Sequence, residues 1–492
     1  MTAGLEVRGG AGGLTVQLTQ LERAAGVLQS VGGDVAETAI VIGLAAAEPS
    51  LALAGVLAPV EYAAAELAIC RCVGPTGAGG IATEILASAV TTRAAVATYR
   101  TGEAAVEALF DGAATAVGAG VGATVGAAAP AVTAVAVGVA LSPGARIALQ
   151  VPGARERVLA VGLGLGQGAD EILADHPWLV PAAADGLDGL VLGVGVGRPA
   201  LGTWLSWRSG RLGVPYPPRT RAEALGVILA ATRGAALDES DQDVSVRVHR
   251  QGGGRAPTGV TDLVAAHGPT SGGSRVRLTG VPRADGTWTW VVDVPGTQTF
   301  HPRAGANPWD LTSNVLLSSG RATLTTRAVS RALADAQRRT GSTLTSRVML
   351  TGHSQGGLTA AALAADPAFR ERHGVTHVVT SGAPIATVGV PEEVSVLSLE
   401  HAEDLVPGLE GEDNPDRESW VTVRRAVADE LGPDARATQA HHVGRYAETA
   451  RLVDASDDPS LASWRRGASN FLDGEGGEAV VIDYDIERVP RE

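Results

Sequence analysis

The chain has 492 residues, a formal net charge of −14 and no lysine, so all of its fixed positive charges are arginines. This acidic balance argues against nucleic acid as a partner, because phosphate binding requires a basic surface. The length predicts more than one domain, and a hydrophobic content of 45% is sufficient for sizeable cores.

The first part of the chain is rich in Ala, Gly, Val and Leu and predicts helices. Apolar residues at helical spacing predict helices over 14–28 and 62–72. A longer helix is predicted over 81–110, after the glycine-rich turn 74–80. We therefore expect a helical N-terminal domain over residues 1–210.

Two candidate metal-binding stretches lack the pattern of a metal site. Cys70 and Cys72 stand alone around Arg71, without further Cys or His ligands, and a disulfide across one residue is strained. We predict two buried thiols in a helix. The stretch 413–416 offers oxygen ligands for calcium, but its composition is typical of an acidic turn. We predict neither a metal nor an organic cofactor.

The predicted hairpin, over roughly residues 10–110, resembles the small helical modules of type VII secretion substrates. Tyr99 and Glu103 fit the Y-x-x-x-D/E export signal of those modules, although the spacing is also that of an ordinary helix-surface pair. The W-x-G turn of many such modules is missing. The resemblance implies contact with a secretion machinery. Because no Sec-type signal peptide is visible, we expect a cytoplasmic protein or one exported by a type VII-like route.

Residues 112–145 carry no charge and are numerous enough to span a bilayer. Glycines four residues apart form a ridge on one helix face in two places: Gly118, Gly122 and Gly126, and Gly189, Gly193 and Gly197. One interpretation is membrane contact through residues 1–207. The favoured alternative is close packing of helices in a soluble bundle, since Ala and Gly contribute little transfer energy and Pro130 interrupts the stretch.

The composition changes around residues 208–221, and strands then alternate with helices. Strands are predicted at 244–249, 275–281, 288–294, 347–351, 375–381, 394–399 and 479–485, and helices at 222–235, 323–339 and 358–365. This alternation predicts a mainly parallel sheet with helices on both faces over residues 215–492.

A G-x-S-x-G motif, Gly352-His353-Ser354-Gln355-Gly356, follows one of these strands and precedes a helix. This context is typical of a nucleophile elbow, in which a sharp turn lifts a serine above the edge of the sheet. Gly352 and Gly356 are required because side chains would clash in so tight a turn. The motif predicts that Ser354 is a nucleophile.

A serine nucleophile needs a histidine base, and the histidine needs a carboxylate that fixes its tautomer. In α/β-hydrolases the acid follows a later strand. Asp404 comes after the predicted strand 394–399, in a D-x-V-P setting that resembles the acid loop of lipase-like hydrolases. Glu400, Glu403 and Asp413 are weaker candidates.

The base must come from His441 or His442, the two histidines that follow the candidate acid. Similar hydrolases often place the catalytic histidine five residues before a tyrosine that packs in the next helix. This resemblance implies His441 as the base and Tyr446 as the packing residue, with His442 as the alternative.

An oxyanion hole needs two N–H donors, one of them directly after the nucleophile. Gln355 supplies the first. The turn Pro295-Gly296-Thr297-Gln298 follows a predicted strand and resembles the G-T turn of lipases, so Thr297 or Gln298 would supply the second.

The oxyanion turn, the elbow, the acid and the base occur in the required order. Over about residues 215–490 the chain resembles the α/β-hydrolase superfamily, in particular uncharacterised actinobacterial hydrolases of lipase or esterase type. The resemblance implies an α/β fold with a mostly parallel, doubly wound sheet, preceded here by an all-α Ala/Gly-rich domain.

The implied function is hydrolysis of a small-molecule or lipid carboxylic ester through a Ser-His-Asp triad and an acyl-enzyme. The alternatives are a thioesterase or amidase, and a secreted or membrane-associating binding protein whose hydrolase-like domain is not catalytic.

Overall fold

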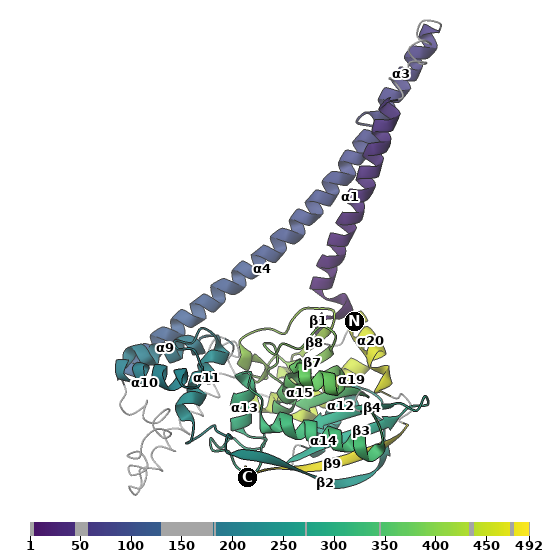
Figure 1. The fold of residues 1–492 in the computed structure, drawn as a ribbon. Coiled ribbons are helices and arrows are strands. Elements are labelled where there is room, and N and C mark those ends of the chain that lie inside the picture. Colours follow the sequence, from purple (N-terminus) through teal and green to yellow (C-terminus); the bar gives the residue numbers. More distant parts are fainter. Residues whose placement is uncertain are drawn as a thin grey trace. The chain divides into compact units, whose positions relative to one another are not determined.

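The computed structural model describes residues 4–44, 58–128, 181, 184–270, 273–343, 346–431, 437–472 and 477–491. The chain forms two compact units (Figure 1). One comprises residues 14–109, and the other comprises residues 1–13 together with 110–492. The units therefore do not divide at the predicted boundary between 210 and 215.

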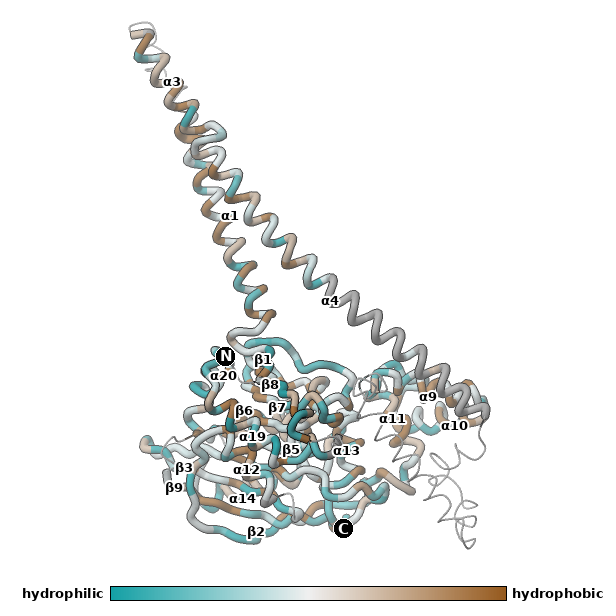
Figure 2. The backbone as a smooth tube through the Cα atoms, turned by 180° about the vertical axis from the view of Figure 1, so that it is seen from behind, coloured by the Kyte–Doolittle hydropathy of each residue, from teal (hydrophilic) through white to brown (hydrophobic). Residues whose placement is uncertain are grey.

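The smaller unit consists of α1 (Leu14–Leu44), α3 (Pro59–Val73) and the first part of α4 (Ala78–Ala128). Apolar and polar residues are interspersed along α1 (Figure 2). Small side chains allow α1 and α4 to approach closely, since a Cβ atom on Gly32 would lie 2.9 Å from Cγ of Leu86. The predicted hairpin is present, with longer helices than expected because alanine-rich sequence continues a helix readily.

One expectation for this unit is wrong. Cys70 and Cys72 are exposed rather than buried, and over residues 60–73, where burial is described, α3 has no buried residue that would define a core-facing side around them. Tyr99 and Glu103 lie within α4, as the predicted helix over 81–110 implies.

By length and composition α1 meets the requirement for crossing a bilayer, but core helices and signal sequences also meet it. The uncharged stretch predicted as a possible span begins within α4, and its residues 129–145 lie outside the described part of the chain.

The second glycine ridge lies in α9 (Leu187–Gly197), where a Cβ atom on Gly189 would stand 2.0 Å from the carbonyl oxygen of Thr115 in α4. This contact favours close helix packing as the role of that ridge.

A small apolar core joins α9 to α10 (Pro199–Gly210) and α11 (Arg221–Thr232). Val191, Leu205 and Val227 belong to it. Because these side chains pack across the compositional change at 208–221, the helices on either side of that stretch belong to one unit.

The larger unit is built on a nine-stranded sheet in the order β1-β8-β7-β6-β5-β4-β3-β9-β2 (Figure 1). The strands are β1 (Leu5–Gly9), β2 (Gln242–Arg255), β3 (Arg275–Pro282), β4 (Trp288–Val294), β5 (Arg347–His353), β6 (Gly374–Ser381), β7 (Ser395–His401), β8 (Trp420–Arg425) and β9 (Glu478–Pro490). Strands β4 to β8 run parallel, and the remaining pairings are antiparallel. The sheet is therefore mixed rather than mostly parallel as predicted.

Helices cover both faces of the sheet. They are α12 (Val260–Thr270), α13 (Leu311–Ser318), α14 (Leu324–Thr340), α15 (Gln355–Ala365), α16 (Pro367–Arg372), α19 (Val443–Asp454) and α20 (Pro459–Gly467), with the single turns α17 (Ala428–Leu431) and α18 (Ala437–Ala440). Along β5 the side chains alternate between two cores. Val348 and Leu350 pack with α14 and α15, whereas Met349 packs with residues of α12, α19 and α20.

Strands β1 and β8 were not predicted from the sequence. Strand β1 pairs antiparallel with β8 in a register that places Leu5 opposite Arg425. Leu5 is 8% exposed and belongs to the same core as Val421 and Val423. The N-terminal strand thus completes one edge of a sheet formed by much later residues.

We predict that Leu5→Ala lowers the free energy of unfolding by about 2 kcal/mol, because it leaves a cavity in a packed core. Glu6→Ala on the exposed face of the same strand should change it by less than about 0.5 kcal/mol. Urea unfolding of the two variants measures both effects. Equal, small changes would show that β1 does not pack in the sheet.

Candidate active site

The turn between β5 and α15 holds Ser354 in a conformation that few non-glycine residues adopt. Ser354 caps the start of α15 with φ 56° and ψ −125°. Such strain is concentrated at functional sites, where the surrounding structure maintains it. The amide of Ser354 donates to the carbonyl of Ser381 at 2.9 Å, which ties the turn to the end of β6.

The two motif glycines lie where the backbone crowds itself. A Cβ atom on Gly352 would stand 2.3 Å from the carbonyl carbon of Gly356, and one on Gly356 would stand 2.1 Å from the carbonyl oxygen of Val294. Any side chain at either position would push β4, β5 and α15 apart. The elbow geometry therefore requires both glycines.

Asp404 and His441 form a hydrogen-bonded pair at the carboxyl end of the parallel strands. Nδ1 of His441 lies 2.7 Å from Oδ2 of Asp404, whose side chain is 1% exposed. Oδ2 also accepts the Tyr446 hydroxyl at 2.6 Å, and Oδ1 accepts the amide of Val406 at 2.9 Å. These donors fix the carboxylate, and a proton on Nδ1 leaves Nε2 of His441 as the basic nitrogen.

Gly382 brings the pair and the serine turn together. It follows Ser381, the residue that accepts the Ser354 amide, and has φ +58°. A Cβ atom there would lie 2.8 Å from Oδ2 of Asp404 and 3.0 Å from Nδ1 of His441. The end of β6 thus contacts both the serine turn and the Asp–His pair. Gly382 was not predicted from the sequence to be part of the site. Its position directly after a predicted strand is the feature that could have indicated it.

His353 is a second residue that the sequence analysis did not single out. Its Nε2 lies 2.8 Å from the carbonyl oxygen of His441, and the two rings are 4.4 Å apart. Burial, together with the neighbouring His441, holds the pKa of His353 well below its ordinary value, so the ring is neutral at pH 7. A neutral His353 with a proton on Nε2 donates to His441 and positions its backbone.

The remaining contacts around His441 come from a buried stack. His401 and Tyr446 lie 3.8 Å apart and nearly parallel. His401 contacts the carbonyl oxygen of Ala440 at 2.7 Å through Nδ1, which anchors the segment just before His441. Tyr446 is fully buried, and burial beside Asp404 raises the pKa of its hydroxyl well above the ordinary value. The hydroxyl therefore stays protonated and acts as a donor to Asp404.

His442, the alternative base, lies at the start of α19. Its Nδ1 accepts the amide of Gly444 at 3.1 Å and caps the start of α19. Of the two candidate bases, the structure places only His441 against Asp404.

The weaker acid candidates are engaged elsewhere. Glu403 accepts the amides of Val427 and Ala428, and Asp413 pairs with Arg8 at 2.7 Å. Glu400 accepts the Asn414 side chain at 2.5 Å, and burial raises its pKa to about 7.

The predicted oxyanion turn lies beside Ser354. A Cβ atom on Gly296 would stand 3.5 Å from Cβ of Ser354. The amide of Gln298 already donates to the carbonyl of Trp309 at 2.8 Å, which corrects its assignment as a candidate donor and leaves Thr297. The amide of Gln355 lies in the first turn of α15, where helix N–H groups lack partners within the helix.

The segment that begins α13 contacts both sides of the predicted oxyanion hole. Asn314 donates to the Thr297 hydroxyl at 3.0 Å, and the Gln355 side chain donates to the carbonyl of Asp310 at 3.1 Å. Asp310 also caps α13 by accepting the amide of Ser313 at 3.0 Å. A shift of this segment would move both predicted oxyanion donors.

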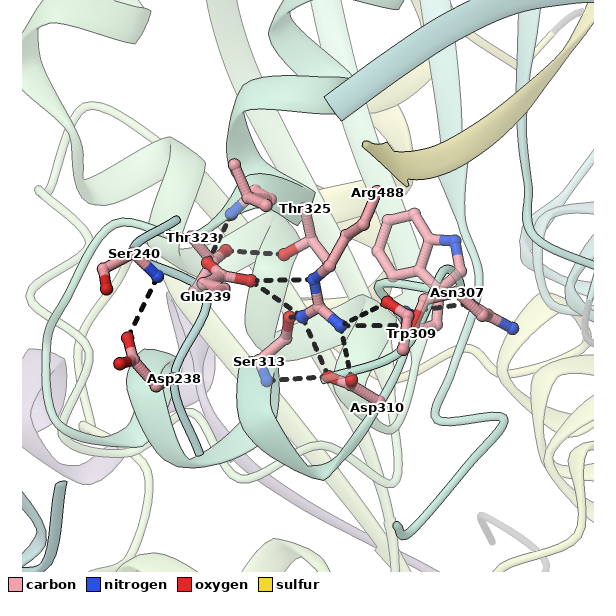
Figure 3. A network of polar contacts seen from close by, with 12 residues as sticks. Asp238, Glu239, Ser240, Asn307, Trp309, Asp310, Ser313, Thr323, Thr325 and Arg488 are labelled. Carbon is pink, nitrogen blue, oxygen red and sulfur yellow. Dashed lines mark hydrogen bonds and ion pairs between the residues drawn. The ribbon is translucent and has the colours of Figure 1, made fainter. Parts of the chain in front are cut away.

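A buried ion network fixes Asp310 (Figure 3). Arg488 of β9 contacts both carboxylate oxygens of Asp310, and both side chains are 1% exposed. The same guanidinium bonds to Glu239 at 2.7 Å and to the Ser313 hydroxyl at 3.0 Å. The last strand of the chain therefore anchors the segment that supports the elbow.

Comparisons of the chain with protein-family models, with characterised proteins and with solved structures find no match. The interpretation of the site therefore depends on its geometry.

We predict that Arg488→Met lowers the free energy of unfolding by about 3–5 kcal/mol, because it leaves two buried carboxylates without their cation. Arg250→Met provides a surface control from the neighbouring strand, since its side chain is 66% exposed and pairs with Asp483 at 3.4 Å. That variant should lose less than about 1 kcal/mol. Denaturant titrations measure both losses, and a small loss for Arg488→Met would contradict a structural role of the network.

Glu400 should make stability depend on pH. Between its ordinary pKa of 4.5 and the folded-state value of about 7, the folded protein retains a proton that the unfolded chain releases. The contribution of Glu400 to the free energy of unfolding therefore falls as pH rises through this window, by about 3 kcal/mol in total. Glu400→Gln removes this dependence.

Unfolding of wild type and Glu400→Gln at pH 5 and pH 8 tests this prediction. The variant should gain stability relative to wild type at pH 8. Glu418→Gln, at an exposed position, makes the same change of charge and serves as the control. A constant difference between Glu400→Gln and wild type would contradict the prediction.

Proposed function

We propose that the larger unit has an α/β-hydrolase fold and that the chain is a serine hydrolase of carboxylic esters. The observation that carries the proposal is the Asp404–His441 pair, 2.7 Å apart, beside a serine held at φ 56° at the start of α15. The parallel strands β4 to β8 support it, because the predicted functional residues follow the carboxyl ends of four of them: Thr297 follows β4, Ser354 β5, Asp404 β7 and His441 β8.

In the proposed mechanism, Oγ of Ser354 attacks the ester carbonyl while Nε2 of His441 accepts its proton. His441 then donates that proton to the departing alkoxide, which leaves an acyl group on Ser354. A water molecule activated by the same nitrogen hydrolyses the acyl-enzyme. Asp404 holds the histidine tautomer and stabilises the imidazolium that forms.

The amides of Gln355 and Thr297 are the proposed oxyanion donors. They would stabilise the negative charge on the carbonyl oxygen in the tetrahedral intermediate, and removal of one such donor typically costs about 10²–10³ in rate. Because the side chains of Gln355 and Thr297 are tethered to the α13 segment, the hole is set before substrate binds.

Esters are favoured over amides because an alkoxide leaves more readily than an amine and needs less assistance. The same triad also serves thioesters and amides. Comparing hydrolysis of ester, thioester and amide substrates identifies the acyl group and the leaving group.

Labelling with a fluorophosphonate probe tests the function without requiring a known substrate. We expect wild type to be labelled and Ser354→Ala to be silent, since the probe reports only an activated serine. Absence of labelling in folded wild type would overturn the proposal and favour a non-catalytic binding domain.

The two neighbouring histidines give a matched control. His441→Ala should lower the labelling rate by at least about 10³, because the general base is lost. His442→Ala should retain most of the rate, since His442 caps α19 and is not paired with Asp404. If the effects are reversed, His442 is the base and the proposed triad is wrong.

A further inference from the structure

We propose a second ligand site, distinct from Ser354, in a cavity of about 660 Å³ in the larger unit. It is lined by parts of α11, α14 and α16 and by residues 237–240. The ligand is a small anion that carries an apolar chain. This inference goes beyond the proposed hydrolase function and does not depend on it.

The cavity is separated from the serine by the length of α15. Leu363 near the C-terminal end of α15 lines the cavity, whereas Ser354 caps the N-terminal end. An α-helix rises 1.5 Å per residue, so the two positions are about 13 Å apart. A ligand in the cavity therefore does not occupy the position of an ester at Ser354.

Positive charge is concentrated around this cavity. Six of its lining residues are arginines, in a chain whose net charge is −14: Arg233, Arg321, Arg327, Arg331, Arg372 and Arg491. Arg327 and Arg331 pair with Asp243 at 3.1 and 3.2 Å. Within the described part of the chain, the other four form no ion pair.

The carboxylates of the cavity wall are already occupied. Asp238 accepts the amide of Gly234 at 2.9 Å and that of Ser240 at 3.0 Å; the bond to Ser240 is drawn in Figure 3. Glu239 binds Arg488, with which it forms part of the network behind the oxyanion segment (Figure 3). Glu239 therefore has a cation outside the cavity lining, whereas Asp238 accepts backbone amides and is also close enough to Arg233 for that charge to lower its pKa.

The third wall carboxylate, Asp366, accepts the amide of Ala368 at 2.9 Å. The unpaired guanidinium groups thus remain available to an external anion. Arginine presents parallel N–H donors that match phosphate and carboxylate oxygens.

One part of the wall is apolar, formed by Leu212, Leu229, Leu316, Leu363 and Phe369, and it lies beside hydroxyl residues that include Thr323, Thr326 and Ser330. Leu237, which also lines the cavity, has a left-handed backbone conformation with φ 52°. Its amide donates to the carbonyl of Pro302 at 2.8 Å. Strained non-glycine residues of this kind occur at ligand-binding sites. An apolar surface beside unpaired arginines fits a ligand with an anionic head and a short hydrocarbon chain.

Titration calorimetry with the full chain tests the site. Octyl phosphate and octanoate, below their critical micelle concentrations, share the proposed chemistry and differ in the head group. We expect one or both to bind at least tenfold more tightly than the two controls. Inorganic phosphate has only the anionic head, and octanol has only the apolar chain. The stronger of the two identifies the head group.

A charge-matched pair of variants locates the binding. Arg321→Gln/Arg372→Gln should weaken binding of the stronger amphiphile at least tenfold. Arg451→Gln/Arg466→Gln removes two exposed arginines from α19 and α20 and should leave binding unchanged. Thermal unfolding confirms that both double variants are folded.

The proposal is overturned if neither amphiphile binds, if octanol or phosphate alone binds as tightly, or if both double variants weaken binding equally. Fluorophosphonate labelling in the presence of the amphiphile separates the two sites. Binding without loss of labelling supports a distinct cavity, whereas competition would place the amphiphile at Ser354 and overturn it.

Discussion

The closeness of the backbone at the β5–α15 turn is the constraint on which the rest of the site depends. Gly356 lies so near the carbonyl of Val294 that no side chain fits between β4 and α15. This contact fixes Ser354 in its strained conformation and holds the end of β4 beside it. The proposed oxyanion turn, which begins at Pro295, therefore starts adjacent to the serine. The point at which this loop begins follows from the pairing of β4 with β5.

The supporting structure is layered around this turn. Residues near the start of α13 hold the oxyanion side, and the His401–Tyr446 stack holds the Asp404–His441 side. Asp310 on one side and Asp404 on the other are buried carboxylates that accept several donors, so displacement of either layer would leave a buried carboxylate unpaired. The arrangement is stiff because several elements would have to move together for either side of the site to shift.

Local sequence patterns predicted the elements nearest the serine well. The predicted strands at 288–294 and 347–351 correspond to β4 and β5, since both are short apolar runs bounded by turn residues. The patterns also placed Ser354 between a strand and a helix. These features depend on residues that are neighbours in sequence.

What the sequence could not predict depends on distant contacts. The amide of Gln298 is engaged by Trp309, and the role of Gly382 arises from the approach of a loop that follows another strand. Cys70 was expected inside a core because its helix is apolar, but composition does not specify which surface will be covered. The edge strand β1 was missed because five residues carry too little pattern.

That edge strand has a consequence for the order in which the fold can form. Leu5 emerges during synthesis well before its partner Arg425. At ribosomal rates of about 5–20 residues per second, β1 waits roughly 20–80 s for β8. The parallel strands β4 to β7 emerge earlier and can assemble without it. Pairing of β1 can therefore occur only after β8 has emerged, and until then β7 presents an open edge to other chains.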